Sequence, residues 1–205
     1  GISLERLRDV LLPGTGAAGF AELERLAAAA PPGSGGVLFT PWLNGERTPV
    51  DDRLIRGGLH NLTLATTREH VARAVFEGVA LDIRWMQLAV ERFCRRRLDP
   101  IAFVGGGARS AFWAQTMADV LGRTVQRLEA PASVGLRGAA LLAFLGLGEL
   151  GPDDLHGRAP IAHTHQPSRE TEALYDELFA AFRDIYRAGR RVSGRLAAVR
   201  DLEEA

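Results

Sequence analysis

The 205-residue sequence contains no lysine, since all 25 of its basic residues are arginine. A P-loop of the GxxxxGK[ST] type places a lysine on the phosphates, so this sequence cannot form one. Catalysis through a lysine Schiff base is excluded for the same reason. The high content of Ala, Gly and Arg indicates a GC-rich genome as the source of this bias.

Cysteine, net charge and long apolar runs are also scarce. Cys94 is the single cysteine, so an internal disulfide and a cysteine-rich metal site are excluded, and a reducing cytoplasm is the expected compartment. The 25 basic and 25 acidic residues cancel, which argues against a nucleic-acid binder. No run of 18 apolar residues is present and the first residues lack a signal-peptide pattern, so we expect no membrane partner.

The hydrophobic periodicity predicts alternating helices and strands. Helices are expected at 3–12, 20–30, 67–97, 109–121 and 134–147 and in an amphipathic stretch after residue 168, and strands at 37–39, 101–104 and 124–128. The order of elements from 67 to 147 is typical of parallel strands in an α/β layer fold. Residues 41–62 read as a long loop that is functional or holds an interface, and 151–168 as a connector.

Burial can be predicted for four of these elements. Thr66 and Glu69 predict a capping box at the start of the longest helix. That helix is expected to bury a stripe formed by Val79, Ile83, Met86, Val90 and Phe93. The strand at 101–104 should be buried on both faces, and the Gly- and Ala-rich helix at 134–147 should pack closely against a sheet. The last helix should bury one face, made of Tyr175, Leu178, Phe179, Phe182, Ile185 and Tyr186.

Three consecutive glycines, Gly105 to Gly107, lie between the strand at 101–104 and the helix at 109–121. Glycines at the end of a strand let the backbone approach a ligand closely, and the start of a helix offers free amides to an anion or a polar ring edge. Ligands of open α/β sheets lie at this end of the strands. The spacing is not GxGxxG, so a Rossmann dinucleotide site is disfavoured, and a tight turn that needs small residues is the structural alternative.

Other polar groups have a structural reading that we favour. Glu46 and Arg47 could contact a polar substrate, but ion pairs that hold the loop explain them better. Asp51 and Asp52 could bind Mg²⁺, although a solvated turn explains them better. The segment His163–His165 places two imidazoles on one side of an extended chain, and without a third ligand they are connector histidines rather than a metal site.

Four ordered blocks resemble the C-terminal half of the FGGY carbohydrate kinases, most nearly the xylulokinase and gluconate-kinase branches. They are PWLNGERTP (41–49), IRGGLHNLTLATTREHVARAVFEGVA (55–80), IAFVGGGARSAFWAQTMADVLGRTVQRLE (101–129) and GLRGAALLAFLGLGEL (135–150). The resemblance implies an actin-like (ribonuclease H-like) α/β fold. Asn61 stands where the family usually has Gly, and Asn tolerates a left-handed backbone better than most residues.

The resemblance also implies an ATP site. In these kinases the turn that matches Gly105, Gly106, Gly107 and Ala108 lines the adenine and ribose, and Arg109, Ser110 and Ala111 begin the following helix. The opening segment resembles one that places a glycine and a Gln against the nucleotide in glycerol-type members, which corresponds to Gly1 and Glu5. The carboxylate of Glu5 departs from that pattern, because it would repel a polyphosphate.

The family's catalytic base, phosphate loop, sugar pocket and Mg²⁺ ligands have no counterpart in this sequence, so no catalytic residue is assigned. We therefore expect a partial C-terminal kinase domain at 1–194 and a frayed tail at 195–205, in a fragment or truncated product that is inactive alone. The expected reaction of the parent is transfer of a phosphoryl group from MgATP to D-xylulose. Gluconate or ribulose kinase, or a non-catalytic nucleotide-binding or interaction module, is the alternative. The strand at 101–104 would have one free edge, so self-association is expected.

Overall fold

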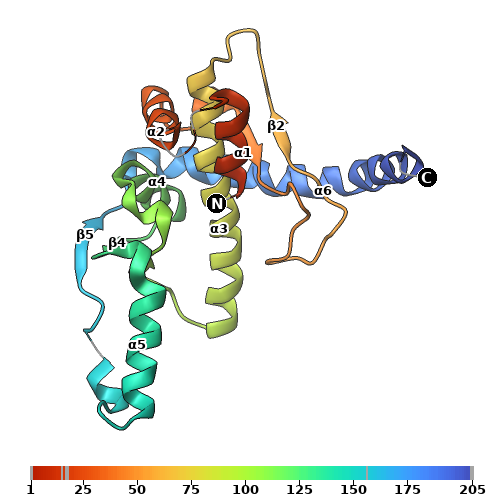
Figure 1. The fold of residues 1–205 in the computed structure, drawn as a ribbon. Coiled ribbons are helices and arrows are strands. Elements are labelled where there is room, and N and C mark those ends of the chain that lie inside the picture. Colours follow the sequence, from red (N-terminus) through yellow and green to blue (C-terminus); the bar gives the residue numbers. More distant parts are fainter. Residues whose placement is uncertain (1, 15, 17–18, 156, 204–205) are drawn as a thin grey trace.

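The computed structural model describes residues 2–14, 16, 19–155 and 157–203. Its helices are α1 (Ile2–Leu11), α2 (Gly19–Ala29), α3 (Arg68–Cys94), α4 (Ala111–Leu121), α5 (Val134–Gly146) and α6 (Glu172–Glu203). Its strands are β1 (Leu38–Thr40), β2 (Gly58–His60), β3 (Ile101–Phe103), β4 (Val125–Leu128) and β5 (Ile161–His165). Figure 1 shows α3 at the centre, with α5 below the rest of the molecule. No helix in the described ranges is long and apolar enough to cross a membrane.

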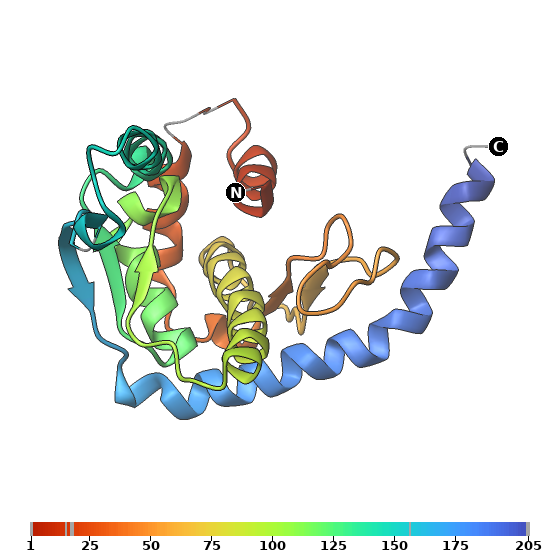
Figure 2. The ribbon, with the colours of Figure 1, turned by 90° about the horizontal axis from the view of Figure 1, so that it is seen from below.

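The core forms around the first half of α3. This half packs against α2, α4 and β1, and α6 runs past it along one side of the molecule (Figure 2). The side chain of Trp42, which is 1% exposed, joins the loop after β1 to α6 through ring contacts of 4.9 Å with Phe182 and 5.5 Å with Tyr186. The predicted apolar face of the last helix is confirmed, since its four aromatic residues are buried and its two aliphatic residues are partly buried against the core.

The strands form two small sheets. β3 and β4 pair in parallel, as the succession of elements predicts, and β4 also pairs with β5 in antiparallel orientation. β1 and β2 form a separate antiparallel pair in which Leu38 lies opposite His60. β2 and β5 correct the prediction that 41–62 and 151–168 lack regular structure. β2 (GLH) and β5 (IAHTH) contain few apolar residues, so neither shows the apolar run by which β1 and β3 were predicted.

The start of α3 differs from the prediction by one residue. The N-cap is Thr67, whose hydroxyl accepts from the His70 amide while the His70 ring accepts from the Thr67 amide. The hydroxyl of Thr66 accepts instead from the Thr63 amide at 2.9 Å, within the preceding turn. The capping box at Thr66 and Glu69 is therefore wrong, because the local turn already uses the Thr66 side chain.

The stripe predicted along α3 is buried only near its start. Val79 and Ile83 are partly buried against the core, whereas Met86 and Val90 are exposed and Phe93 is 89% exposed. The second half of α3 extends past the core (Figure 1), and no described element covers that face. Periodicity predicted the stripe itself, but burial also requires a neighbouring element.

Three further expectations need correction or comment. β3 pairs only with β4 among the described strands, and Ala102 and Val104 are exposed rather than buried because no described element covers that face. α6 continues as a helix past residue 194 to Glu203, where a frayed tail was expected. Asn61 does adopt the left-handed conformation, with φ 60°, and its amide donates to the Gly36 carbonyl at 3.1 Å.

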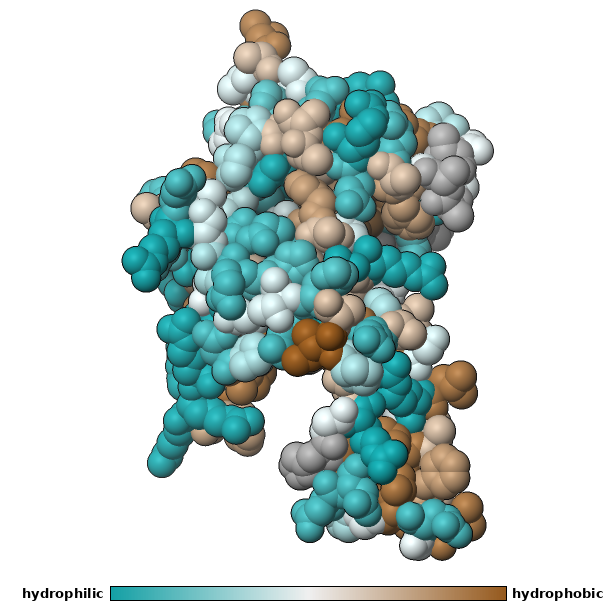
Figure 3. Space-filling view, turned by 90° about the vertical axis from the view of Figure 1, so that its left-hand side faces the viewer, coloured by the Kyte–Doolittle hydropathy of each residue, from teal (hydrophilic) through white to brown (hydrophobic). Residues whose placement is uncertain are grey.

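Helix α5 is the largest departure from expectation. It was predicted to pack against a sheet, yet none of its residues is buried. The space-filling view in Figure 3 shows hydrophobic side chains along the lower projection that contains α5. The most exposed of them are Leu136 (76%), Leu142 (68%) and Phe144 (50%), with Leu147 (75%) just beyond the helix. Among the described residues, no sheet face covers this helix.

Candidate nucleotide-binding turn

The glycine turn connects β3 to α4 through a short 3₁₀ helix, η3 (Gly106–Arg109). Gly105 adopts φ 85° and ψ −170°, a conformation that only glycine adopts readily. A Cβ at Gly105 or Gly106 would point into open space, with no atom within 4 Å. The outer side of this turn is therefore accessible at the level of the backbone.

The inner side of the turn rests on Trp113, which is 9% exposed. A Cβ at Gly107 would lie 2.4 Å from a ring carbon of Trp113, so no side chain fits there. The indole makes edge contacts with Phe76 and Phe103, with ring centroids 5.4 Å and 5.7 Å away. Gly107 is thus required for packing, while Gly105 and Gly106 leave space for a ligand.

Hydrogen bonds fix the rest of the turn. The Gly105 amide donates to the Pro131 carbonyl at 2.8 Å, and the Ala108 amide donates to the Gly105 carbonyl at 3.2 Å. The Ser110 hydroxyl accepts from the Trp113 amide at 2.9 Å and so caps α4. The amides of Gly106 and Gly107 have no acceptor among the residues that the structure describes, and they remain available as donors.

The expected site residues fall into two groups. Gly105 to Ala111 form one continuous turn, in which Ala108 is buried and the Arg109 side chain is exposed. Glu5 is an exposed residue of α1, a helix that Figures 1 and 2 show apart from the turn. Gly1 lies outside the described residues. Seven of the nine expected residues therefore lie together in the turn, and Glu5 lies away from them.

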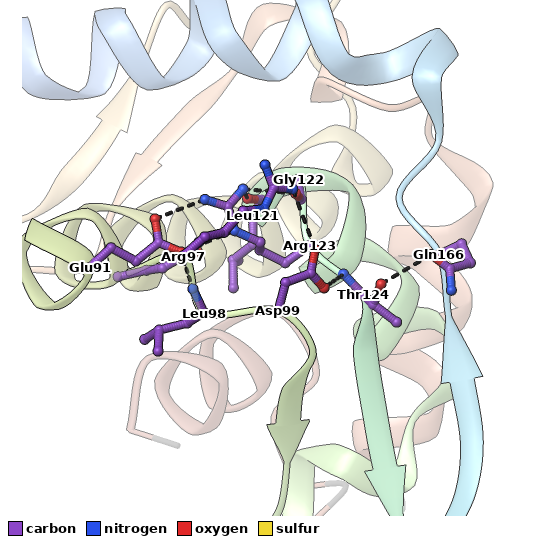
Figure 4. A network of polar contacts seen from close by, with 10 residues as sticks. Glu91, Arg97, Leu98, Asp99, Leu121, Gly122, Arg123, Thr124 and Gln166 are labelled. Carbon is purple, nitrogen blue, oxygen red and sulfur yellow. Dashed lines mark hydrogen bonds and ion pairs between the residues drawn. The ribbon is translucent and has the colours of Figure 1, made fainter. Parts of the chain in front are cut away.

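A polar network joins α3 to the segment formed by β3, the glycine turn and α4 (Figure 4). Glu91 on α3 accepts from the Arg123 guanidinium at 2.8 Å and from the Leu98 amide at 2.8 Å. Asp99 accepts from the Thr124 amide at 3.1 Å. Burial alone would raise the pKa of Glu91, but the hydrogen bonds from Arg123, Leu98 and Gln87 lower it to about 2.

A small polar cleft of about 220 Å³ adjoins this network, between α3, the end of α4 and the start of α6. Three arginines line it, and each is already engaged. Arg84 pairs with Asp176, Arg123 pairs with Glu91, and Arg97 donates to the Gly122 carbonyl at 3.2 Å. Because internal partners use these guanidinium groups, we assign no ligand to this cleft.

The carboxyl groups of Glu46 and Asp82 hold the loop at 41–57; of the two residues expected to form ion pairs there, Arg47 does so and Glu46 accepts backbone amides instead. Glu46 is 9% exposed and accepts from the amides of Arg47 and Thr48 at 2.7 Å and 2.8 Å. Arg47 itself pairs with Asp51 at 3.5 Å on the surface. Trp42 donates to Asp82 at 3.2 Å, and burial together with the neighbouring Glu46 raises the pKa of Asp82 to about 8.

Asp52 also has a structural role. It accepts from the amides of Leu54 and Ile55 at 3.1 Å and from the Tyr186 hydroxyl at 3.2 Å, and it pairs with Arg190 at 3.2 Å. This carboxylate joins the loop to α6, and both of its oxygens have protein partners. The solvated-turn reading was therefore incomplete for Asp52.

A buried charged cluster around Glu77 was not found from the sequence. Glu77 is 2% exposed, pairs with Arg73 at 2.7 Å, and accepts from the Ser34 hydroxyl at 2.6 Å and the Tyr175 hydroxyl at 2.8 Å. Together these contacts join α3, α6 and the turn before β1. A glutamate four residues after an arginine within a predicted apolar helix was the available signal.

His163 and His165 of the connector lie on β5. The His165 ring contacts the Gln115 side chain at 3.3 Å, and burial lowers its pKa. Within the described ranges, no three His, Cys, Asp or Glu side chains gather in a group that could hold a metal ion. These histidines lie on an edge strand of the sheet, and His165 contacts α4.

Comparison with known proteins identifies the family of the chain. The family model for the C-terminal domain of the FGGY family of carbohydrate kinases matches residues 6–147. A xylulose kinase from Staphylococcus epidermidis is 31% identical over 182 residues, which cover 88% of this chain and 36% of the relative. The chain thus spans about a third of the length of such relatives.

Solved structures of the same family superpose closely. The xylulose kinase from Rhodospirillum rubrum gives a TM-score of 0.80 at 33% identity, over 95% of this chain and 39% of that one. The gluconate kinase from Lactobacillus acidophilus gives 0.80 at 26% identity, over 96% of this chain and 39% of that one. The actin-like fold class expected from the sequence is confirmed. The chain belongs to the FGGY family of carbohydrate kinases, within that family's C-terminal domain.

Proposed function

We propose that this chain is the nucleotide-binding part of an ATP-dependent kinase that phosphorylates D-xylulose to D-xylulose 5-phosphate. The observation that carries the proposal is the exposed glycine turn, with two unused amides, in a chain that belongs to a carbohydrate kinase family. The xylulose kinases among its relatives favour a ketopentose as the acceptor.

The turn supplies the contacts for the adenosine part of ATP in this proposal. The amides of Gly106 and Gly107 donate to the polar edge of the nucleotide, and the conformation of Gly105 lets the ligand approach the backbone. Arg109 is exposed and has no ion-pair partner among the described residues, so its guanidinium is available to a phosphate. Ala108, Ser110 and Ala111 shape the turn, and any role of Gly1 and Glu5 belongs to the same proposal.

No catalytic residue is proposed in this chain. Phosphoryl transfer depends mainly on positioning and on stabilisation of charge. The catalytic base, the Mg²⁺ ligands and the sugar pocket would be supplied by polypeptide that the longer relatives carry in addition. We also propose that the enzyme acts in the cytoplasm.

A different acceptor is the second candidate. The gluconate kinase from Lactobacillus acidophilus superposes with the same TM-score as the xylulose kinase from Rhodospirillum rubrum. Gluconate or ribulose therefore remains an alternative to xylulose. A catalytically empty nucleotide-binding or interaction module is the alternative from another class, and it too would bind ATP through the turn.

We also propose that the open side of the sheet is an interface. β3 has one free edge among the described strands and is followed by the exposed Val104, and α5 carries exposed apolar residues. An unpaired strand edge beside apolar side chains favours association with another chain. A second copy of this chain is the partner we expect in isolation.

Two measurements test the proposed function. Titration calorimetry with MgATP should show binding to the 205-residue chain, with no change on addition of D-xylulose. A coupled assay for ADP should show turnover well below roughly 1 s⁻¹, the low end of typical enzymes, with D-xylulose, D-ribulose, D-gluconate or glycerol. Turnover above that rate would overturn the view that this part lacks the catalytic groups, and absence of ATP binding would overturn the function itself.

A further inference from the structure

Arg127 on β4 holds the glycine turn through two of its carbonyl oxygens. Its Nε donates to the Ala108 carbonyl at 2.7 Å, and its terminal nitrogen donates to the Arg109 carbonyl at 3.2 Å. Arg127 is half-buried; its bond to the Ala108 carbonyl is partly buried, and its bond to the Arg109 carbonyl is exposed. Only an arginine provides donors in a fixed fork that reach two neighbouring carbonyls at once.

These bonds determine the orientation of the peptide units in the turn. In a trans peptide the N–H points opposite to the C=O of the same unit. When Arg127 draws the Ala108 carbonyl toward β4, the Arg109 amide is therefore directed to the opposite side. The Trp113 ring packs against the turn at Gly107. The turn is therefore held by the Trp113 ring on one side and by the Arg127 guanidinium through its carbonyls.

We infer that Arg127 is a positioning residue for nucleotide binding, which acts by holding the 108–109 end of the turn in place and so the position of the Gly106 and Gly107 amides that precede it. This inference rests on the proposed function, because the turn must be the nucleotide site for its orientation to matter. Arg127 touches no reacting atom in this account. Its effect passes through the carbonyls of Ala108 and Arg109.

The test measures MgATP affinity by calorimetry for wild type, Arg127→Met and Arg127→Lys. Loss of two hydrogen bonds from a charged group should weaken binding about tenfold in Arg127→Met. Arg127→Lys keeps the charge but has a single ammonium, so it should restore only part of the affinity. Gln126→Met, on the same strand and also half-buried, is the matched control and should bind as wild type does.

Hydrogen exchange at the amides of 106–109 gives a local readout that general loss of stability would not produce. Exchange there should become faster in Arg127→Met than in Gln126→Met, at a temperature where circular dichroism shows both folded. If Arg127→Met does not fold, Arg127→Lys decides the question in the same two measurements.

The outcomes separate this inference from the proposed function. Wild-type affinity in Arg127→Met, or full affinity in Arg127→Lys, would overturn the positioning role while the nucleotide site stands. A wild-type chain that does not bind MgATP would overturn the proposed function, and the inference with it.

Discussion

Two strand–turn–helix units follow each other along the chain, and only one of them is integrated into the core. β3, η3 and α4 form the first, and α4 buries seven of its residues. β4, the short 3₁₀ helix η4 (Pro131–Ser133) and α5 form the second, and α5 buries none. Both helices are apolar in sequence. The difference shows that an apolar pattern predicts a face that needs covering, whereas the neighbouring elements decide whether it is covered.

The units also differ at the helix start. Ser110 caps α4 with its hydroxyl, whereas Ser133 makes no such bond at the start of α5. Trp113 and Arg127 hold the turn before α4, and Glu91 and Arg123 join the end of that unit to α3. The first unit, which contains the candidate site, is therefore held by more contacts than the second. A binding site formed by backbone amides requires such a rigid support.

The largest expected effect comes from removing buried volume in α4. Leu121→Ala should destabilise the chain by about 3 kcal/mol, because Leu121 is 3% exposed and its loss leaves a cavity. Leu142→Ala in α5 is the matched variant and should change stability by less than about 0.5 kcal/mol. Urea unfolding followed by circular dichroism measures both. Equal effects would mean that α5 is covered in solution and that the comparison is wrong.

Glycine substitutions should give the next largest difference. Gly107→Ala places a methyl group against the Trp113 ring and should cost about 2 kcal/mol. Gly138→Ala in α5 points into open space and should be neutral or slightly stabilising, because alanine favours the helix. The same unfolding experiment applies, and unchanged stability in Gly107→Ala would show that the turn does not rest on Trp113.

The link from α3 to the first unit should appear in the pH dependence of stability. The pKa of Glu91 is lowered from 4.5 to about 2 in the folded state. Its contribution is therefore fully present above about pH 4.5 and is lost as the pH falls toward 2. Glu91→Gln should lower the urea midpoint at pH 7 and flatten its decline between those two pH values. Glu22→Gln, at an exposed ion pair on α2, should change the pH dependence of the urea midpoint less. Identical pH dependence for the wild type and both variants would show that Glu91 does not stabilise the contact between α3 and the first unit.

The exposed face of α5 should affect association more than stability. Changing Leu136 and Leu142 to Ser should reduce self-association and leave the urea midpoint nearly unchanged, since both side chains are exposed. Light scattering at tens of micromolar is the measurement. A clean monomer for the unaltered chain would contradict the proposed interface.

The sequence predicted most of the fold because its helices carry clear periodicity and three of its strands, β1, β3 and β4, could be recognised. It placed the glycine turn between β3 and α4, and the resemblance identified the family. It missed β2 and β5, because their sequences, GLH and IAHTH, lack the apolar run that marks β1 and β3. It misjudged α5 and the second half of α3, because periodicity does not say which element covers a face.

The supporting contacts of the site could not be predicted in the same way. The bonds from Arg127 to two carbonyls, and the packing of Trp113 beneath Gly107, join residues that are not neighbours in a regular pattern. The carboxyl of Asp82 beside Glu46 likewise depends on how the loop at 41–57 folds onto α3. Such contacts follow from tertiary packing, which a single sequence does not show.

The most direct test of the central claim is a titration of the ¹⁵N-labelled chain with MgATP, observed by NMR. The account predicts that the amides of Gly105, Gly106, Gly107 and Ala108 shift with one saturable affinity, while that of Gly146 in α5 does not move. Saturable shifts elsewhere with these four amides unchanged would show that the nucleotide binds at another place. They would contradict the assignment of the glycine turn as the nucleotide site.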